Sequence, residues 1–123
     1  MNLEDIPRVN WPSGPSSYKV VQLEIDGQPY LRFEEANYYT HGLIIDTLLR
    51  KLGIKYDQIK GMTGSWVPAL EGERYKVKGM GRAVMLTGNK VSFLGNSVDY
   101  GLGIDRDHLD AIKALESERG LIY

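Results

Sequence analysis

Three separated stretches of this chain carry residue types that can bind and attack a phosphoryl group. His41 opens an apolar run, and Arg82 follows the Gly-Met-Gly of residues 79–81. Residues 95–101, Gly-Asn-Ser-Val-Asp-Tyr-Gly, are mostly small or polar. A neutral imidazole accepts a proton from water, or attacks phosphorus itself, near neutral pH. Arginine offers a planar fork to phosphate oxygens, and glycines let backbone amides converge on an anion.

Each of these signals also has an ordinary structural explanation. A lone histidine is usually a surface or capping residue, and two glycines before a strand permit a turn or bulge. Residues 79–82 lack the spacing and the Lys-Ser/Thr ending of a Walker loop, and Ser97 lacks the Gly-x-Ser-x-Gly elbow of a serine nucleophile. His108, beside Asp107 and Asp110, is expected to be a solvated surface residue. Two histidines without a spacing motif predict no metal site.

The composition predicts one soluble, cytoplasmic domain. The chain has 123 residues, 42% of them hydrophobic, which suffices for a single core. With 15 basic and 16 acidic residues the formal net charge is −1, which argues against a general nucleic-acid or membrane-surface binder. The absence of cysteine excludes disulfides, thiolate catalysis and cysteine metal sites. No apolar stretch approaches the roughly 20 residues of a membrane span, and the first residues do not have the pattern of a signal peptide.

The first half of the chain predicts a leader, a hairpin and a helix. Residues 1–17 contain three prolines and three serines and form an irregular leader, which either packs through Trp11 or stays mobile, before a single domain over 18–123. Residues 18–33 are predicted to form two strands around an Asp-Gly turn, because apolar and polar residues alternate before it. Thr40 is suited to cap the helix that follows. The apolar stripe of this helix is Ile45, Leu48, Leu49 and Leu52, with Gly53 just past its end.

The second half predicts further strands and a second helix. Because hairpins dominate the order of elements, we expect an α+β domain whose mixed or largely antiparallel sheet is covered by helices. The expected elements are a strand at 54–62, a loop at 63–74, strands at 82–86 and 90–94 joined by Thr87-Gly88-Asn89, a helix from Asp105 to Ser117, and a short strand at 121–123.

These pieces, in this order, resemble the Janus/Ocnus family, whose characterised members are small phosphohistidine phosphatases. Residues 94–101 look like the family's Y-G-x-S-x-x-Y-G segment, and residues 79–82 look like its G-x-G-R before a hairpin. Residues 40–46, which begin Thr-His, are similar to the Y-H-x-x-I-x-D that opens its helix, and residues 18–21 look like its first strand. The resemblance covers residues 18–116.

The resemblance implies a phosphohistidine phosphatase-like fold, a mixed sheet of roughly six strands flanked by two helices. It also implies a phosphatase site without metal or cofactor, whose substrate is a phosphorylated protein or a small phosphorylated molecule; the oligomeric state stays open. His41 would be the catalytic base or nucleophile, and Lys19 and Arg82 would neutralise the phosphoryl oxygens. The anion cradle would consist of Gly81, Ser97, Val98 and Asp99.

The chain departs from the family pattern at four places. Thr40 precedes the histidine where the family usually has tyrosine, and Arg32 is one place out of register with an upstream arginine. Residues 66–78 are an extra segment. Asp99 stands where a small uncharged residue is usual, and its carboxylate would repel a phosphate unless the side chain turns away. The alternative function is a non-catalytic ligand-binding, partner-binding or oligomerisation domain on the same scaffold.

Overall fold

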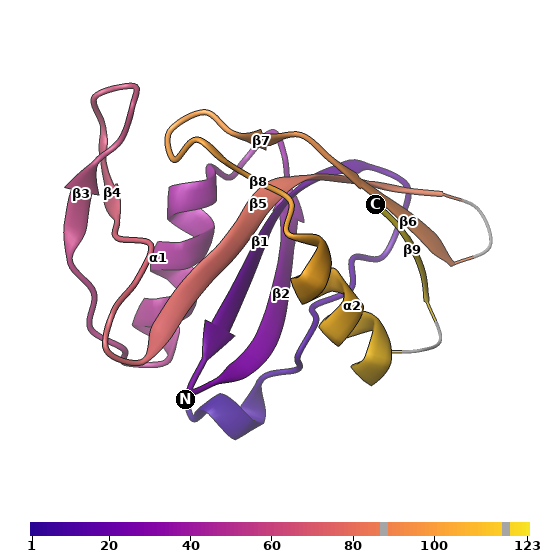
Figure 1. Ribbon diagram of the computed structural model, residues 1–123, viewed down its shortest axis with the longest axis horizontal. Helices are drawn as coiled ribbons and strands as arrows, with labels where there is room; N and C mark the ends of the chain where they lie inside the picture. Colours follow the sequence, from indigo (N-terminus) through magenta and orange to yellow (C-terminus); the bar gives the residue numbers. More distant parts are fainter. Residues whose placement is uncertain (87–88, 117–118) are drawn as a thin grey trace.

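The computed structural model describes residues 1–86, 89–116 and 119–123 and shows an α+β fold (Figure 1). The main sheet is mixed, in the order β2-β1-β5-β6-β9, and only its β6–β9 pair is parallel. Two short hairpins, β3–β4 and β7–β8, form separate sheets. The elements are the 3-10 turn Leu3–Asp5, β1 Ser17–Ile25, β2 Gln28–Glu35, α1 His41–Lys51, β3 Gln58–Lys60, β4 Trp66–Pro68, β5 Tyr75–Met85, β6 Lys90–Leu94, β7 Asn96–Ser97, β8 Leu102–Gly103, α2 Arg106–Leu115 and β9 Gly120–Ile122.

The main sheet has five strands among the described residues, not the six expected. The strand expected at 54–62 shrinks to β3, which pairs with β4 in a hairpin beside α1 (Figure 1). A local turn makes this pairing, because Gly64 adopts a φ of 91° and its amide donates to the Gly61 carbonyl at 3.0 Å. The extra segment 66–78 thus supplies β4 and the first part of β5.

The first hairpin and the first helix confirm the predictions made from local signals. Asp26 and Gly27 have φ values of 50° and 80°, the left-handed pair that a two-residue hairpin turn requires. The Thr40 hydroxyl accepts a hydrogen bond from the Leu43 amide at 3.1 Å and caps α1. Gly53, with a φ of 67°, follows the helix as its left-handed terminator.

The two helices cover opposite faces of the sheet. Alternate side chains of β1 point to different faces, so Val21 packs in one core with Leu49 of α1. Val20 packs in a second core with Ile112 of α2. A strand that is apolar on both faces is typical of a central position between two layers, and β1 lies between β2 and β5.

The glycines of residues 79–81 lie inside the central strand β5 instead of at a turn before it. A Cβ on Gly81 would approach the Leu94 carbonyl oxygen to 2.6 Å and the Ile104 Cδ1 to 2.7 Å. A Cβ on Gly79 would collide with Gln22 and approach the Asp105 amide to 2.8 Å. Glycine is therefore needed here because the chain between β6 and α2 passes directly over the strand.

The first residues of the chain pack along the outer edge of β2. Val9 forms an isolated bridge with Leu31, whose amide donates to the Arg8 carbonyl at 2.8 Å. The Asn10 side chain exchanges two hydrogen bonds with the backbone of Phe33, at 2.7 and 2.9 Å. This segment therefore covers an edge that would otherwise be free to pair with another strand.

The second helix begins where expected, but the prediction for its histidine is wrong. The Asp105 carboxylate caps α2 by accepting from the His108 amide at 3.0 Å. His108 is only 4% exposed, and its Nε2 donates to the Leu23 carbonyl at 3.0 Å. Its acidic neighbours predict a surface position, whereas the helical periodicity places it on the face that packs against β1.

The end of the chain forms β9, as predicted, and pairs with β6. Thr87 and Gly88 of the expected hairpin turn lie outside the described residues, as does Ser117 at the expected end of the second helix. Within the described part of the chain, no helix is long and apolar enough to cross a membrane.

The burial of His108 predicts a pH-dependent stability. Burial lowers its pKa below the usual 6.5, so at mildly acidic pH the unfolded chain binds a proton that the folded chain does not. The stability that the neutral, buried His108 provides is therefore complete above pH 6.5. It is lost as the pH falls from 6.5 towards the lowered pKa. We expect the melting temperature to fall between about pH 7.5 and about pH 5, and to fall less in His108→Gln. Equal slopes for the two proteins in thermal melts would contradict this assignment.

Candidate active site

A pocket of about 190 Å³ lies between β1, β5, the start of α1 and the loop after β7. It gathers the side chains that the sequence singled out, although they come from four separate parts of the chain. Gly81 is the one member of the predicted set that does not line the pocket, and it contacts the site through its backbone. The lining residues are Lys19, Thr40, His41, Arg82, Asn96, Ser97, Val98 and Asp99.

His41 is held in one orientation by the backbone of β5. Its Nε2 lies 2.8 Å from the Gly81 carbonyl oxygen, and because a carbonyl only accepts, Nε2 must be the donor. The proton of the neutral ring is therefore on Nε2. Nδ1 has no hydrogen bond to a described residue, so its lone pair is available to a ligand or to water.

The surroundings of His41 keep its ring neutral at physiological pH. The residue is 9% exposed, and burial lowers its pKa below 6.5, with the nearby charges of Lys19 and Arg82 acting in the same direction. The Gly81 hydrogen bond and Asp99 oppose this shift. A histidine with a lowered pKa is unprotonated, and hence able to act as a base or nucleophile, over a wider pH range.

Two cations flank the histidine without carboxylate partners. Lys19 and Arg82 are paired across the β1–β5 ladder, so both side chains lie on the same face of the sheet. Neither lies within 4.0 Å of a carboxylate in the described part of the chain. Since α1 begins at His41, the positive end of its dipole adds to this potential. The pocket is therefore suited to an anion.

The loop after β7 offers hydrogen-bond donors to the same space. Ser97 is buried and lines the pocket, and its carbonyl accepts from the Gly101 amide at 2.8 Å, which closes the loop into a tight turn. The amides of Val98 and Asp99 make no hydrogen bond to a described residue. Unused amides at a turn form the kind of concavity that binds anions.

The Asp99 carboxylate is held by the turn between β3 and β4. It accepts hydrogen bonds from the Thr63 hydroxyl and, at 3.3 Å, from the Thr63 amide, on the turn between β3 and β4. The Asp99 carbonyl also accepts from the Met62 amide at 2.9 Å. The hairpin thus fixes the Asp99 side chain, which keeps its negative charge and still borders the pocket.

Sequence reasoning missed three residues of this site. Thr40 and Asn96 line the pocket, and their position next to His41 and Ser97 was the available signal. Thr63 is 36 residues away from the Asp99 that it binds, and no local pattern indicates that contact. A second hollow of about 370 Å³, between α1 and the β3–β4 hairpin, shares Thr40 and Asp99 with the pocket.

Other groups of the chain do not join this site. Arg32, the out-of-register arginine, lines a separate pocket with none of the same residues. Groups of three or more His, Asp or Glu side chains that would hold a metal ion are absent from residues 1–86, 89–116 and 119–123. No protein-family model matches the chain, and no curated protein matches it either.

The position of Asp99 predicts that its charge weakens anion binding. Asp99→Asn keeps an oxygen for Thr63 and removes one negative charge. We therefore expect inorganic phosphate to bind about fivefold more tightly, a gain of about 1 kcal/mol in binding free energy. Isothermal titration calorimetry measures this change, with Asp107→Asn on α2 as the charge-matched control. Unchanged or weaker binding in Asp99→Asn would show that phosphate does not occupy this pocket.

Proposed function

We propose that this protein is a small phosphatase of the Janus/Ocnus kind that acts without a metal, with His41 as general base or nucleophile. The observation that carries the proposal is the neutral His41 ring, fixed through Nε2 and free at Nδ1, beside two unpaired cations. Phosphoryl transfer requires mainly positioning and charge stabilisation, and both are available here.

Two routes use the same residues. In the first, Nδ1 of His41 takes a proton from a water molecule as its oxygen attacks phosphorus, and the leaving group departs with its bonding electron pair. In the second, Nδ1 attacks phosphorus itself, and the leaving group departs with its bonding electron pair. A water oxygen then attacks the phosphoimidazole, the P–N bond breaks with its electron pair returning to Nδ1, and inorganic phosphate is released. In either route Lys19, Arg82 and the amides of Val98 and Asp99 stabilise the negative charge on the phosphoryl oxygens.

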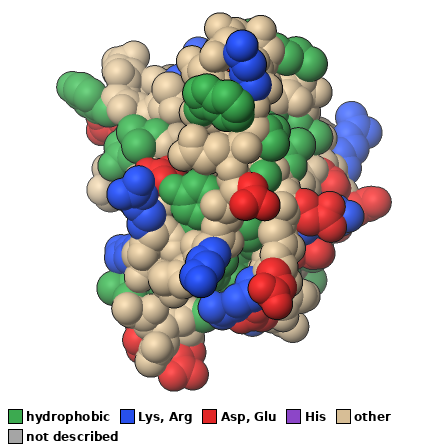
Figure 2. All heavy atoms as spheres, turned by 90° about the vertical axis from the view of Figure 1, so that its left-hand side faces the viewer, with side chains coloured by type: hydrophobic (Ala, Val, Ile, Leu, Met, Phe, Trp, Pro, Cys, Tyr) green, Lys and Arg blue, Asp and Glu red, His purple; other side chains and the backbone are tan. Residues whose placement is uncertain are grey.

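The surface around the pocket favours a phosphorylated protein over a small phosphorylated molecule. Met62, Trp66 and Val98 are 77%, 67% and 71% exposed, and they belong to the hairpin and loop that border the site. In Figure 2, hydrophobic side chains lie among charged ones of both signs on the side that carries this hairpin. Apolar side chains beside an anion site are suited to bind the polypeptide that flanks a phosphorylated residue.

The central test is the loss of turnover in His41→Ala. We expect hydrolysis of phosphohistidine and of an aryl phosphate, measured in the presence of a chelator, to fall at least about 100-fold because the base or nucleophile is missing. Arg82→Ala should weaken phosphate binding while Arg106→Ala on α2 leaves it unchanged. Normal turnover by folded His41→Ala would refute the proposal. Tight phosphate binding without turnover in the wild type would favour the non-catalytic binding domain.

Trp66 tests the choice of substrate. We expect Trp66→Ala to raise KM for a phosphohistidine-containing protein about tenfold, because an exposed aromatic contact is lost, and to leave kcat for an aryl phosphate unchanged. Leu115→Ala, which removes an exposed apolar side chain from α2, is the matched control. Equal kinetics of Trp66→Ala and wild type on the protein substrate would point to a small phosphorylated molecule instead.

A further inference from the structure

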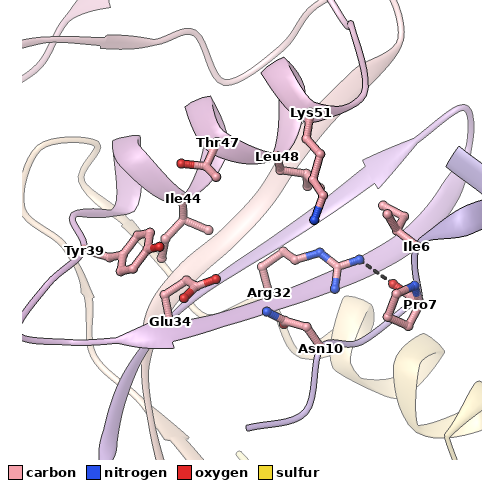
Figure 3. Close-up of a pocket in the computed structure, with 10 residues that line it drawn as sticks. All are labelled: Ile6, Pro7, Asn10, Arg32, Glu34, Tyr39, Ile44, Thr47, Leu48 and Lys51. Carbon is pink, nitrogen blue, oxygen red and sulfur yellow. Dashed lines mark hydrogen bonds between the residues drawn. The ribbon is translucent and has the colours of Figure 1, made fainter. Parts of the chain in front are cut away.

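A second pocket, separate from the candidate active site, surrounds the side chain of Arg32. It has a volume of about 140 Å³ and lies between the N-terminal segment, β2 and α1 (Figure 3). None of its lining residues lines the pocket of His41. We call it the Arg32 pocket; its lining includes Ile6, Arg32, Glu34, Ile44, Leu48 and Lys51.

Arg32 is a buried cation that the protein leaves partly unsatisfied. The residue is 6% exposed, and its Nε is buried without a hydrogen-bond partner. One terminal nitrogen donates to the Pro7 carbonyl. No carboxylate of the described residues lies within 4.0 Å of the guanidinium. Burial lowers the pKa of Arg32 to about 10, so the group is still charged at neutral pH. Glu34 lies in the same pocket and its charge raises this pKa, but it is not in contact with the guanidinium. A buried charge without a counter-ion in contact is costly, and a bound anion offsets that cost.

The rest of the pocket specifies the kind of anion. In Figure 3 the Lys51 ammonium points across the pocket towards Arg32, whereas Glu34 lies at the other end, beside Tyr39. The two cations and the Glu34 carboxylate give the pocket a net charge of +1, which suits a monoanion better than a phosphate dianion. Ile6, Ile44 and Leu48 supply apolar walls.

We propose that the Arg32 pocket binds a small organic monocarboxylate, with the carboxylate between Arg32 and Lys51 and the hydrocarbon part against Ile6, Ile44 and Leu48. A carboxylate accepts two parallel hydrogen bonds from a guanidinium edge, and the free Nε–H belongs to such an edge. The size of the pocket restricts the ligand to a few carbon atoms beyond the carboxylate. The site does not depend on the function of His41, because the two pockets share no lining residue.

The test is an NMR titration of the full chain with isobutyrate, in which the Arg32 Nε–H resonance is followed directly. We expect this resonance to shift saturably with a Kd on the order of 1 mM. Isobutyramide, which has the same shape without the charge, should leave it in place. Lys51 is exposed, so its replacement should not unfold the protein. The Lys51→Gln variant should bind isobutyrate about tenfold more weakly, because Lys51 supplies one of the two positive charges of the pocket. Lys113→Gln on α2 is the charge-matched control.

A second variant keeps the proposal falsifiable. Arg32→Leu replaces an unpaired buried charge by an apolar side chain, a change that proteins often tolerate, and it should abolish isobutyrate binding. The absence of a saturable shift, an equal response to isobutyramide, or unchanged binding in Lys51→Gln would overturn the proposal. A shift of the Arg32 Nε–H with inorganic phosphate and not with isobutyrate would also overturn it. Unchanged isobutyrate binding in His41→Ala would confirm that the two sites are separate.

Discussion

The close approach of the chain after β6 to the central strand β5 determines the rest of this structure. Gly79 and Gly81 have no side chains on the face that this segment crosses, and any Cβ there would meet backbone atoms within 3 Å. The crossing brings the loop after β7 beside the start of α1. The carbonyl of the same Gly81 fixes His41. One strand therefore positions both the anion cradle and the histidine.

The electrostatics of the site follow from this arrangement. His41 is buried beside Lys19 and Arg82, and burial and charge together lower its pKa. Neither cation has a carboxylate partner among the described residues, so both remain available to a ligand. The hairpin of β3 and β4 contributes by binding the Asp99 carboxylate through Thr63. The turn of this hairpin thus fixes the position of a carboxylate that borders the cradle.

The elements that rest on local signals could be predicted from the sequence, and those that rest on distant contacts could not. The Asp26-Gly27 turn, the Thr40 cap and Gly53 each need only their own neighbours. The candidate site residues were predicted from short motifs and from the family resemblance, and not from any contact between them. The length of β5 depends on its pairing with β1, which is far away in the sequence. The same holds for Asp99, whose partner lies 36 residues away. The β3–β4 hairpin is an exception, because it pairs through a local turn that lies partly in a stretch expected to be a loop.

The central claim is that His41 presents an unprotonated Nδ1 to a phosphate bound beside Lys19 and Arg82. The direct measurement is the ¹⁵N NMR spectrum of the His41 imidazole at neutral pH, with and without inorganic phosphate. We predict a protonated Nε2, an unprotonated Nδ1 and a shift of the Nδ1 resonance when phosphate is added. A ring protonated at Nδ1, or one whose Nδ1 does not respond to phosphate, would contradict the account.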